Sequence, residues 1–379
     1  MKIAFFDTKS YWKDAFAPMA EKYGYEITFF NERLTPATAH MAAGHDATCS
    51  FVNDELPAEV VNTLKDLGIK VLLLRCAGFD SVDLEAAKAA GLPVLRVPAY
   101  SPESVAEQGA ALLMTINRNT HLGWDRTTKF NFDIAGLTGI ALAGKTAGVI
   151  GTGKIGQCMI NILKGYGMNI LAYDAFPNPN LGLEYVTLDE LYAKSDVISI
   201  HCPLMPATKH MINADAISKM KDGVILLNFA RDLLADEEAV LRGIKNGKIR
   251  KYVSDFPNST TVGQEGCIVI PHLGASTEES EDNCAKMAVK ELRDYLENGN
   301  IKNSVNYPAC DMGICKSEGR VTICHKNIPG LLGQLTSVCA AEGVNIQDLT
   351  NKSKDEWAYT MLDINTPVSD ALLNALTAV

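Results

Sequence analysis

The sequence predicts an α/β protein of two doubly wound parallel-sheet domains, one inserted into the other, followed by a smaller C-terminal segment. Short apolar runs alternate with helical stretches over about the first 300 residues, which is the pattern of parallel strands covered by helices. The chain passes from the first region to the second near residue 100 and returns near residue 290, which indicates that the second domain is inserted into the first. After residue 320 the order changes to strand, helix, strand, strand, helix.

The first domain is predicted from five apolar runs, at 3–6, 27–30, 47–52, 71–74 and 94–97, with helices at 56–67 and 84–90. Ser101 and Pro102 then mark a helix start, as N-cap and first helical residue, before a long apolar helix at 105–116. We expect this domain to comprise residues 1–100 and 286–308, because residues 304–307 return as a closing segment.

The second domain, residues 101–285, carries the strongest motif. Its predicted strands are 146–150, 170–173, 197–201, 224–228, 250–254 and 267–270. Gly151, Gly153 and Gly156 form a GxGxxG turn between the first of these strands and a helix, and Asp174 ends the next strand. A bare GxGxxG is weak evidence, but strand, glycine turn, helix, strand and acid in this order predict a Rossmann dinucleotide-binding domain.

Each position of this motif has a physical reason. Gly151 supports the tight turn, Gly153 lets the backbone approach a pyrophosphate, and Gly156 lets helix and strand pack closely. Asp174 would accept hydrogen bonds from the adenosine ribose and repel a 2′-phosphate, so the predicted cofactor is NAD and not NADP. The alternative for Asp174 is a solvent-exposed acid at a strand end.

Two capping boxes punctuate the second half of the chain. Thr187 with Glu190 precedes one predicted helix, and Ser276 with Glu279 precedes another that runs to about residue 297. The second of these helices is long enough to carry the chain back to the first domain. A linker at 309–319 then leads to the terminal domain at 320–379.

Composition excludes several classes of protein. The chain has 379 residues, of which 47% are hydrophobic and 21% charged, and its net charge of −10 argues against nucleic acid or an anionic membrane as partner. No signal sequence is visible, and no apolar run approaches the roughly 20 residues that a bilayer requires. The ten cysteines include no CxxC pair, so we expect reduced thiols, a cytoplasmic location and no metal site.

Two further side chains follow predicted strands of the second domain. Arg231 comes after strand 224–228, where a planar guanidinium can hold a substrate carboxylate bidentately. His272 follows strand 267–270, where an imidazole can take the proton of a C2 hydroxyl as hydride leaves for a nicotinamide, or return it in reduction. The alternatives are a surface arginine that heads a helix and a structural histidine.

With these residues in hand, the chain resembles the D-isomer-specific 2-hydroxyacid dehydrogenases over about residues 1–306. Segments such as LLLRCAGFDSVDLEAAKAAGLPVLRVPAYSPESVAE, within residues 1–225, look like D-lactate dehydrogenase. Segments such as LLNFARDLLADEEAV and IPHLGASTEESEDNCA, within residues 226–379, look like D-3-phosphoglycerate dehydrogenase, whose regulatory ACT domain residues 320–379 resemble. The resemblance implies hydride transfer between NAD(H) and a small 2-hydroxy or 2-keto acid, in a homodimer or homotetramer.

The same resemblance implies roles for further residues. The backbone N–H groups of Cys76, Ala77 and Gly78 would bind the substrate carboxylate, with Arg75 and Tyr100 lining the cleft, although Arg75 could equally be a structural ion-pair partner. On the cofactor side the resemblance places Thr152, Lys154 and Ile155 under the pyrophosphate, His201 and Pro203 beside the adenosine, and Phe229, Ala230 and Asp255 near the nicotinamide. His201 could instead be a polar strand end.

The chain departs from the family at one position that affects the chemistry. The family places a glutamate five residues after the Asp255 position, where it bonds the catalytic histidine, and this chain has Thr260 there. A hydroxyl can orient an imidazole but cannot stabilise its charged form. Reduction needs protonated His272, so we expect it to weaken above about pH 7, given an ordinary histidine pKa of roughly 6.5. Glu265 or Glu278 could take over the role of the glutamate.

The two halves of the chain point to different substrates. A phosphate needs cations, and the cleft loops at 50–53 and 76–80 offer little beyond Arg75, so we favour pyruvate and D-lactate, or another small 2-keto acid, over phosphoglycerate. A third hypothesis is a non-catalytic homologue that senses NAD or an amino acid.

The terminal domain suggests regulation. His325, Asn327 and Asn345 match the ACT serine-binding pattern, in which these groups converge at a dimer interface, and the alternative is a loop that only caps a helix. The chain ends where an ACT fold adds one more strand, so a ferredoxin-like ACT domain here is predicted to be truncated, with an open sheet edge.

Overall fold

The computed structural model describes residues 1–379, apart from the side chains of Tyr11 and Met19. The chain forms two compact units: unit 1 comprises Met1–Tyr100 and Glu281–Val379, and unit 2 comprises Ser101–Ser280. Unit 2 is therefore an insertion in the sequence of unit 1. Each unit contains a parallel sheet with helices packed on it, which confirms the predicted α/β class.

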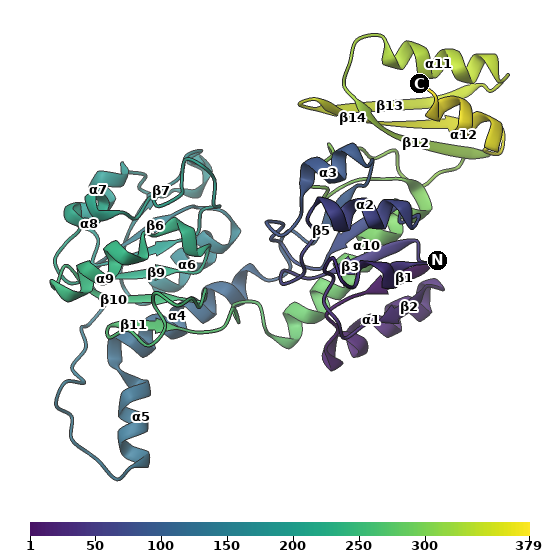
Figure 1. The fold of residues 1–379 in the computed structure, drawn as a ribbon. Helices are drawn as coiled ribbons and strands as arrows, with labels where there is room; N and C mark the ends of the chain where they lie inside the picture. The colour runs from purple at the N-terminus through teal and green to yellow at the C-terminus, as the bar shows by residue number, and fades with distance from the viewer. The chain divides into compact units, whose positions relative to one another are not determined.

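Unit 1 begins with a five-stranded parallel sheet in the order β2-β1-β3-β4-β5 (Figure 1). Its strands are β1 (Lys2–Phe5), β2 (Glu26–Phe29), β3 (Ala47–Ser50), β4 (Val71–Leu74) and β5 (Val94–Arg96). The connecting helices are α1 (Ser10–Tyr23), η1 (Ala39–Ala42), α2 (Ala58–Asp66) and α3 (Leu84–Ala89). The interior strands β3 and β4 are buried along their whole length, as parallel strands covered on both faces must be.

The long helix α10 (Glu278–Asn298) returns the chain to this sheet. Its residues Cys284, Ala288 and Leu292 share one core with Ile3 and Phe5 of β1. The chain then forms an antiparallel bridge between Ser304 and Leu95 of β5. The predicted closing segment therefore does join the first sheet, at its β5 edge.

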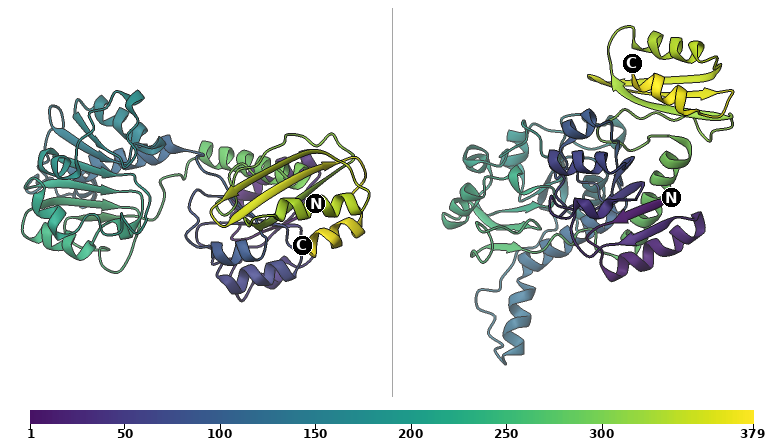
Figure 2. Two further views of the ribbon diagram at one scale, coloured as in Figure 1. Left: turned by 90° about the horizontal axis from the view of Figure 1, so that it is seen from above. Right: turned by 45° about the vertical axis from the view of Figure 1, so that its right-hand side comes forward.

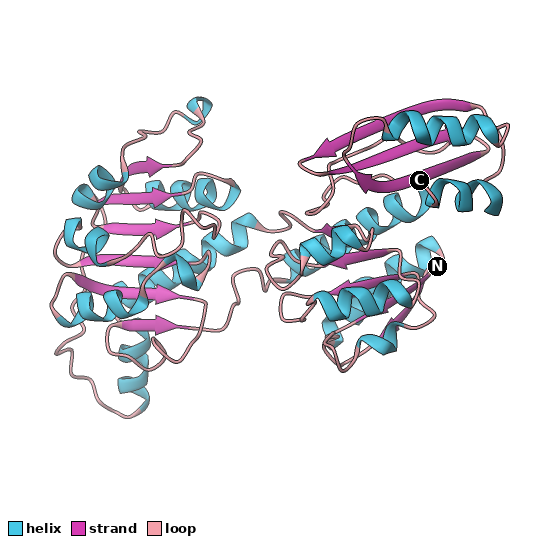
Figure 3. Cartoon of the chain, turned by 45° about the horizontal axis from the view of Figure 1, so that its top comes forward, coloured by secondary structure: helices cyan, strands magenta, loops and turns pink.

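Unit 2 is built on a six-stranded parallel sheet in the order β11-β10-β9-β8-β6-β7, whose strands all point the same way in Figure 3. The strands are β6 (Thr146–Ile150), β7 (Asn169–Tyr173), β8 (Val197–Ile200), β9 (Val224–Asn228), β10 (Ile249–Ser254) and β11 (Cys267–Val269). The helices are α4 (Pro102–Arg118), α5 (Thr120–Thr128), α6 (Lys154–Gly165), η2 (Pro179–Leu181), α7 (Leu188–Lys194), α8 (Ala214–Lys219), η3 (Asp232–Leu234) and α9 (Glu237–Lys245). All six predicted strands are confirmed.

The helix starts were predicted less accurately than the strands. Thr187 accepts a hydrogen bond from the backbone N–H of Glu190, as its capping box predicts. Ser101 does precede α4, but its hydroxyl bonds Ser104 and not a backbone N–H. The predicted cap at Ser276 is wrong, because Thr277 accepts from the N–H of Ser280 at the start of α10.

The terminal segment is a three-stranded antiparallel sheet in the order β12-β14-β13, with two helices. Its elements are β12 (Gly319–Lys326), α11 (Leu331–Ala341), β13 (Ile346–Lys354), β14 (Trp357–Ile364) and α12 (Asp370–Thr377). The order of elements is the predicted one. Leu362 of β14 lies in a small core with residues of both helices, whereas Tyr359 and Met361 of the same strand belong to the core of the first sheet.

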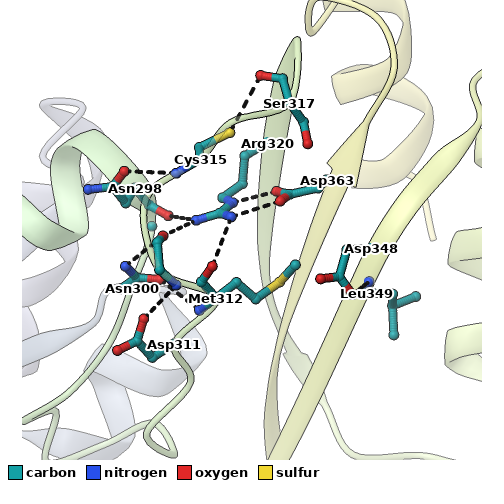
Figure 4. Close-up of polar contacts among 12 residues, drawn as sticks. Asn298, Asn300, Asp311, Met312, Cys315, Ser317, Arg320, Asp348, Leu349 and Asp363 are labelled. Carbon is teal, nitrogen blue, oxygen red and sulfur yellow. Dashed lines mark hydrogen bonds and ion pairs between the residues drawn. The ribbon is translucent and has the colours of Figure 1, made fainter.

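Arg320 of β12 connects the terminal sheet to the chain that precedes it, as Figure 4 shows. Its guanidinium donates to both carboxylate oxygens of Asp363, at 2.5 and 2.8 Å. The same group donates to the backbone carbonyls of Asn298, Gly313 and Met312. A single buried side chain therefore joins the sheet, the linker and the end of α10.

An apolar arm projects from unit 2 where α5 and the following loop leave the body of the domain (Figures 1 and 2). None of the α5 residues is buried. The exposed large apolar side chains of the arm are Leu122, Trp124, Phe130, Phe132 and Ile134. Among the described residues, no helix combines the length and the apolar character needed to cross a bilayer.

Candidate active site

The glycine turn joins β6 to α6 in the conformation that the motif requires. Gly151 has φ +93°, and a Cβ there would lie 2.7 Å from backbone atoms of His201 and Cys202. A Cβ on Gly156 would lie 2.0 Å from the carbonyl oxygen of Gly151. At Gly153, in contrast, a Cβ would meet no atom within 4 Å. Gly151 and Gly156 are thus needed for packing, and Gly153 borders open space where a ligand can approach.

Asp174 directly follows β7 and faces this turn. Its Oδ2 accepts from the backbone N–H and the hydroxyl of Thr152, at 2.7 and 3.0 Å, and its Oδ1 accepts from the N–H of Phe176. Burial alone would raise the pKa of Asp174, but these hydrogen bonds outweigh it and lower that pKa below its ordinary value. A fixed, ionised carboxylate therefore stands where the motif places the ribose of NAD.

The N-terminus of α6 lies beside this carboxylate. Thr152, predicted to lie under the pyrophosphate, already uses its backbone N–H on Asp174. Lys154 and Ile155 begin α6, where backbone N–H groups have no partner in the preceding turn. The residues present thus fit a pyrophosphate at this helix end, with Lys154 and Ile155 better placed than Thr152 to bind it.

His201 and Pro203 follow β8, next to the glycine turn. The His201 Nε2 lies 2.8 Å from the Ser199 hydroxyl, and burial lowers the pKa of His201 to about 4. His201 is therefore neutral near pH 7, which suits a hydrogen-bonding position better than an acid–base one. Pro203 is exposed.

The loop after β9 holds Phe229, Ala230 and Arg231. Phe229 is buried, and its ring lies within about 3 Å of a Cβ built on Gly109 of α4, so its side chain belongs to the core. Arg231 has an extended backbone, its carbonyl accepts from the buried Asn228 side chain at 2.8 Å, and its Nη1 donates to the Ala230 carbonyl. The backbone of Arg231 is thus fixed at the strand end, and its guanidinium turns back to the Ala230 carbonyl.

The loops after β10 and β11 bring together Asp255 and His272. The His272 Nδ1 lies 2.9 Å from Asp255 Oδ2, and the two side chains are 48% and 0% exposed. Their orientation does not meet the geometry of a hydrogen bond, and neither carboxylate oxygen has another partner among the described residues. The carboxylate beside His272 thus comes from a residue that was not predicted there, and the weakening of reduction above about pH 7 stays a prediction. The charge comes from Asp255, and neither Glu265 nor Glu278 forms an ion pair with the ring in the described part of the chain.

All these residues lie along one edge of the sheet of unit 2. The carboxyl ends of the strands, in spatial order from β11 to β7, carry His272, Asp255, Arg231, His201, the glycine turn and Asp174. The order reverses between β8 and β6, and a reversal of this kind is where α/β sheets bind their ligands. Neighbouring strands lie about 4.8 Å apart, so the strands that lead to Arg231 and His272 are about 10 Å apart.

The predicted carboxylate loop lies in unit 1, directly after β4. The N–H groups of Ala77 and Gly78 donate to no acceptor among the described residues, while the Cys76 thiol donates to the Gly78 carbonyl. Tyr100 packs against the core of unit 1, and burial raises the pKa of its hydroxyl. The N–H groups of Ala77 and Gly78 are thus available to an anion.

Arg75 does not lie at the surface of unit 1. The side chain is 0% exposed, and its guanidinium stacks on the rings of Phe5, Trp12 and Phe51 at 4.4 to 5.2 Å. One nitrogen donates to the Asp7 carbonyl, and Nε and Nη1 have no hydrogen-bond partner in the described structure. The structure therefore gives no support to a cleft-lining role for Arg75, and its charge is stabilised by aromatic faces and not by the predicted ion pair.

The structure does not bring the three predicted effector residues together within one chain. His325 pairs with Ala358 at one end of β14, whereas Asn345 precedes Ile346, which pairs with Ile364 at the other end. Six residues of strand separate these positions, which is about 20 Å. Asn327 lies beside Asp355, near the His325 end. The three groups therefore do not meet within one chain, and their convergence at a dimer interface stays a prediction.

Two features of unit 2 were not predicted. Asp255 was expected near the nicotinamide, and its contact with His272 was missed, although parallel pairing of β10 and β11 was a signal that their following loops would meet. The apolar arm was also missed, because the sequence after residue 120 shows no regular hydrophobic period.

A glycine-turn nucleotide site, with an arginine after β9 and an acid-paired histidine after β11, defines an NAD-dependent oxidoreductase. Residues 110–274 match the family described as "D-isomer specific 2-hydroxyacid dehydrogenase, NAD binding domain". D-lactate dehydrogenase of Escherichia coli (strain K12) is 49% identical over 252 residues, 66% of this chain and 77% of that protein. The chain therefore belongs to the D-isomer-specific 2-hydroxyacid dehydrogenase family, whose members act on CH–OH groups.

Solved structures agree with this assignment. The apo-structure of E. coli D-lactate dehydrogenase, 42% identical, superposes with a TM-score of 0.75 and covers 80% of this chain and 100% of that one. The NAD complex of the D-isomer-specific 2-hydroxyacid dehydrogenase from Lactobacillus delbrueckii ssp. bulgaricus, 26% identical, has a TM-score of 0.68, over 81% of this chain and 100% of that one. The cofactor is therefore NAD. The likeness of residues 226–379 to phosphoglycerate dehydrogenase stays a prediction.

Proposed function

We propose that this protein reduces pyruvate, or another small 2-keto acid, to the corresponding D-2-hydroxy acid. The observation that carries the proposal is the pairing of His272 with the buried Asp255, one strand away from the strand that leads to Arg231. The 49% identity to a D-lactate dehydrogenase supports the choice of substrate. The burial of Arg75 under aromatic rings supports it too, because Arg75 is the arginine that was expected to meet a phosphate.

In the proposed mechanism the chain's own residues bind the acid and move one proton. NADH, which the glycine turn and Asp174 would hold, would supply a hydride to C2 of the keto acid. Arg231 holds the substrate carboxylate. Protonated His272 gives its Nε2 proton to the keto oxygen, while Nδ1 remains turned to Asp255. Oxidation of the hydroxy acid reverses these steps.

The proposed cofactor site lies within unit 2. We assign cofactor binding to unit 2, which carries the glycine turn and Asp174, and the predicted anion-binding loop after β4 belongs to unit 1. In this assignment Lys154, Ile155, His201 and Pro203 border the cofactor, and the backbone of Phe229 and Ala230 lies near its nicotinamide end. Cysteines that are all free fit the cytoplasmic location expected from the sequence.

Steady-state kinetics test the choice of substrate. NADH oxidation by the purified full-length chain is followed with pyruvate, with larger 2-keto acids and with 3-phosphohydroxypyruvate, and NAD reduction with 3-phosphoglycerate. We expect turnover with pyruvate or another unphosphorylated acid and at least about 100-fold lower kcat/KM for the phosphorylated pair, because a dianion without cations loses several kcal/mol. Preference for the phosphorylated pair would contradict the proposal.

D-3-phosphoglycerate dehydrogenase with a regulatory ACT domain is the second candidate. The antiparallel sheet with two helices at 319–377 favours it, because the terminal residues resemble that domain and form a sheet of their own. Both ring nitrogens of His325 already face partners, the Lys326 carbonyl and the Thr360 hydroxyl, each at 2.8 Å. We therefore expect L-serine to leave activity unchanged, and inhibition by millimolar serine would favour this candidate. A non-catalytic sensor is disfavoured by the intact His272–Asp255 pair.

We further propose that two copies of the chain associate through the apolar arm of unit 2. Trp124 and Phe130 are 72% and 87% exposed, and an exposed apolar patch of this kind marks a protein interface. Replacing both residues with serine should convert a dimer or tetramer into a smaller species in sedimentation velocity. An unchanged oligomer would place the interface elsewhere.

A further inference from the structure

We propose that Asp255 is the positioning carboxylate of His272, in the role that the family resemblance gives to a glutamate at the Thr260 position. The inference rests on the proposed function, because it concerns the same proton-transfer group. Asp255 itself touches neither substrate nor cofactor in this proposal. It acts through the imidazole, by orienting the ring and by stabilising its charged form.

The sheet of unit 2 places the carboxylate behind the ring. Ser254 of β10 pairs with Val269 of β11, so Asp255 leaves its strand beside the segment that leads to His272. The Asp255 carboxylate is 0% exposed, whereas the His272 ring remains 48% exposed and lies 2.9 Å from it through Nδ1. The contact therefore uses Nδ1 of the imidazole and leaves Nε2 available to the substrate.

The loop that carries Thr260 is held by a different residue. The Asn258 side-chain oxygen accepts from the N–H groups of Thr260 and Thr261, at 2.9 and 3.2 Å. The Asn258 amide nitrogen donates to Glu237 of α9 at 2.7 Å. Within the described structure, no hydrogen bond or ion pair joins Thr260 to His272. The loop is thus held to α9 through Asn258.

Few other groups face the ring. The Phe256 ring lies 4.9 Å from the imidazole, centroid to centroid, and carries no charge. Glu237 is the charged group that faces this loop from α9, and it is engaged by Asn258 and Tyr252. On the other side, Val105 of α4 and Gly274 flank the carboxylate without charge. Among the described residues, Asp255 is thus the one charged group within ion-pair distance of His272.

The contact between Asp255 and His272 should stabilise a charged imidazole. A buried, ionised carboxylate is costly unless a cation or hydrogen-bond donors compensate it, and Asp255 has no other donor among the described residues. Protonation of His272 supplies that cation, so the charged imidazole and the ionised Asp255 stabilise each other. Once His272 has given its Nε2 proton to the keto oxygen, the remaining proton stays on Nδ1 beside Asp255, and this is the tautomer that can accept a proton on Nε2 in the reverse reaction.

The pH dependence of reduction in Asp255→Asn tests the proposal. An amide keeps the shape of the carboxylate but not its charge, so the imidazolium loses its stabilising neighbour. We expect the pH at which the reduction rate falls to half its maximum to move down by about 1 pH unit or more, and kcat to fall on the order of 10²-fold. KM for the keto acid should change much less than kcat, because Arg231 is untouched. Asp255→Glu should restore part of the charge effect.

Thr260→Val is the matched control. It removes the hydroxyl that stands at the family's glutamate position and leaves Asp255 intact. We expect its pH profile to coincide with that of the wild type. A shifted profile in Thr260→Val, or an unshifted one in Asp255→Asn, would overturn the proposal. A shifted profile in Thr260→Val would do so even if Asp255→Asn fails to fold.

A readout that needs no turnover separates this inference from the proposed function. The ring signals of His272 are followed by NMR against pH in isotope-labelled protein, with His272→Gln used for assignment. A protonation midpoint that is lower in Asp255→Asn than in the wild type supports the pairing even if no keto acid is reduced. Turnover of a keto acid with identical His272 titrations in both proteins would leave the proposed function standing and reject the role of Asp255.

Discussion

Two carboxylates of this chain lie buried beside a basic side chain, and their surroundings differ. In the terminal segment, Asp363 receives hydrogen bonds on both oxygens from Arg320, and the two side chains are 10% and 6% exposed (Figure 4). In unit 2, Asp255 is 0% exposed, lacks any hydrogen bond of good geometry among the described residues, and has a half-exposed histidine as its partner.

The difference separates a structural pair from a reactive one. Arginine stays charged at every accessible pH, and Arg320 is also fixed by three backbone carbonyls, so this pair has one state. Histidine can lose its proton near neutral pH, and the burial of Asp255 makes that loss matter to the carboxylate. Removal of the cation should therefore affect chemistry in unit 2 and stability in the terminal segment.

The largest effect is expected for His272→Gln. Glutamine can hydrogen-bond the substrate but cannot deliver a proton, so kcat for keto-acid reduction should fall by about 10²–10⁴-fold. NADH binding, measured by fluorescence titration, should stay within about threefold, because the glycine turn and Asp174 are unchanged. Near-wild-type turnover in this variant would remove His272 from the mechanism and leave the reactive pair without a function.

Arg320→Met is the corresponding change in the terminal segment. It leaves Asp363 buried without its cation, which should cost about 3–5 kcal/mol in the stability of this segment. Urea unfolding and limited proteolysis at 310–379 would detect the loss. Turnover should stay within about twofold, because the site in unit 2 does not include Arg320.

A second variant distinguishes a lost ion pair from a general packing defect. Arg320→Met combined with Asp363→Leu removes both charges and should recover much of the stability that the single change loses. A double variant as unstable as Arg320→Met alone would show that the hydrogen bonds from Arg320 to the carbonyls of Asn298, Gly313 and Met312 dominate its contribution to stability. The Arg320–Asp363 pair would then differ from the His272–Asp255 pair because of those carbonyls.

The strands could be predicted from sequence better than the side-chain partners. All eleven strands of the two parallel sheets lie close to the predicted apolar runs, because full burial leaves near-continuous hydrophobic sequence. The arm at α5 has no such pattern, since no face of it is buried within the chain. The start of α10 was misplaced by one residue because Ser276 and Thr277 are both good N-caps, and only the hydrogen bond to Ser280 decides between them.

Site residues on strand ends were also predictable, and their interactions were not. The motif and strand order sufficed to locate Gly151, Asp174 and His272 at one edge of the sheet. Neighbouring strands indicated only that the loops after β10 and β11 would meet, whereas the contact between Asp255 and His272 depends on how those loops fold beyond their strands. Arg75 was misjudged for a related reason, since only the packed structure shows three aromatic rings around it.

The smallest effect is expected at the other histidine of the sheet edge. His201 has burial and a serine hydroxyl around it and no carboxylate, and burial lowers its pKa to about 4. In the unfolded chain this ring binds a proton below about pH 6.5, while the folded protein does not until about pH 4. Proton binding to the unfolded chain therefore destabilises unit 2 progressively as the pH falls from about 6.5 to about 4.

His201→Gln should remove this pH dependence. The ring is partly exposed, so we expect the contribution to be about 1–2 kcal/mol at pH 4.5, below the full value that the shift implies. Unfolding midpoints in urea at pH 4.5 and pH 7.5 measure it: the loss of stability between the two should be smaller in the variant than in the wild type. Equal losses in both proteins would mean that His201 titrates normally. Burial would then no longer explain a neutral His201. The two histidines would differ only in that His272 has a carboxylate neighbour, Asp255.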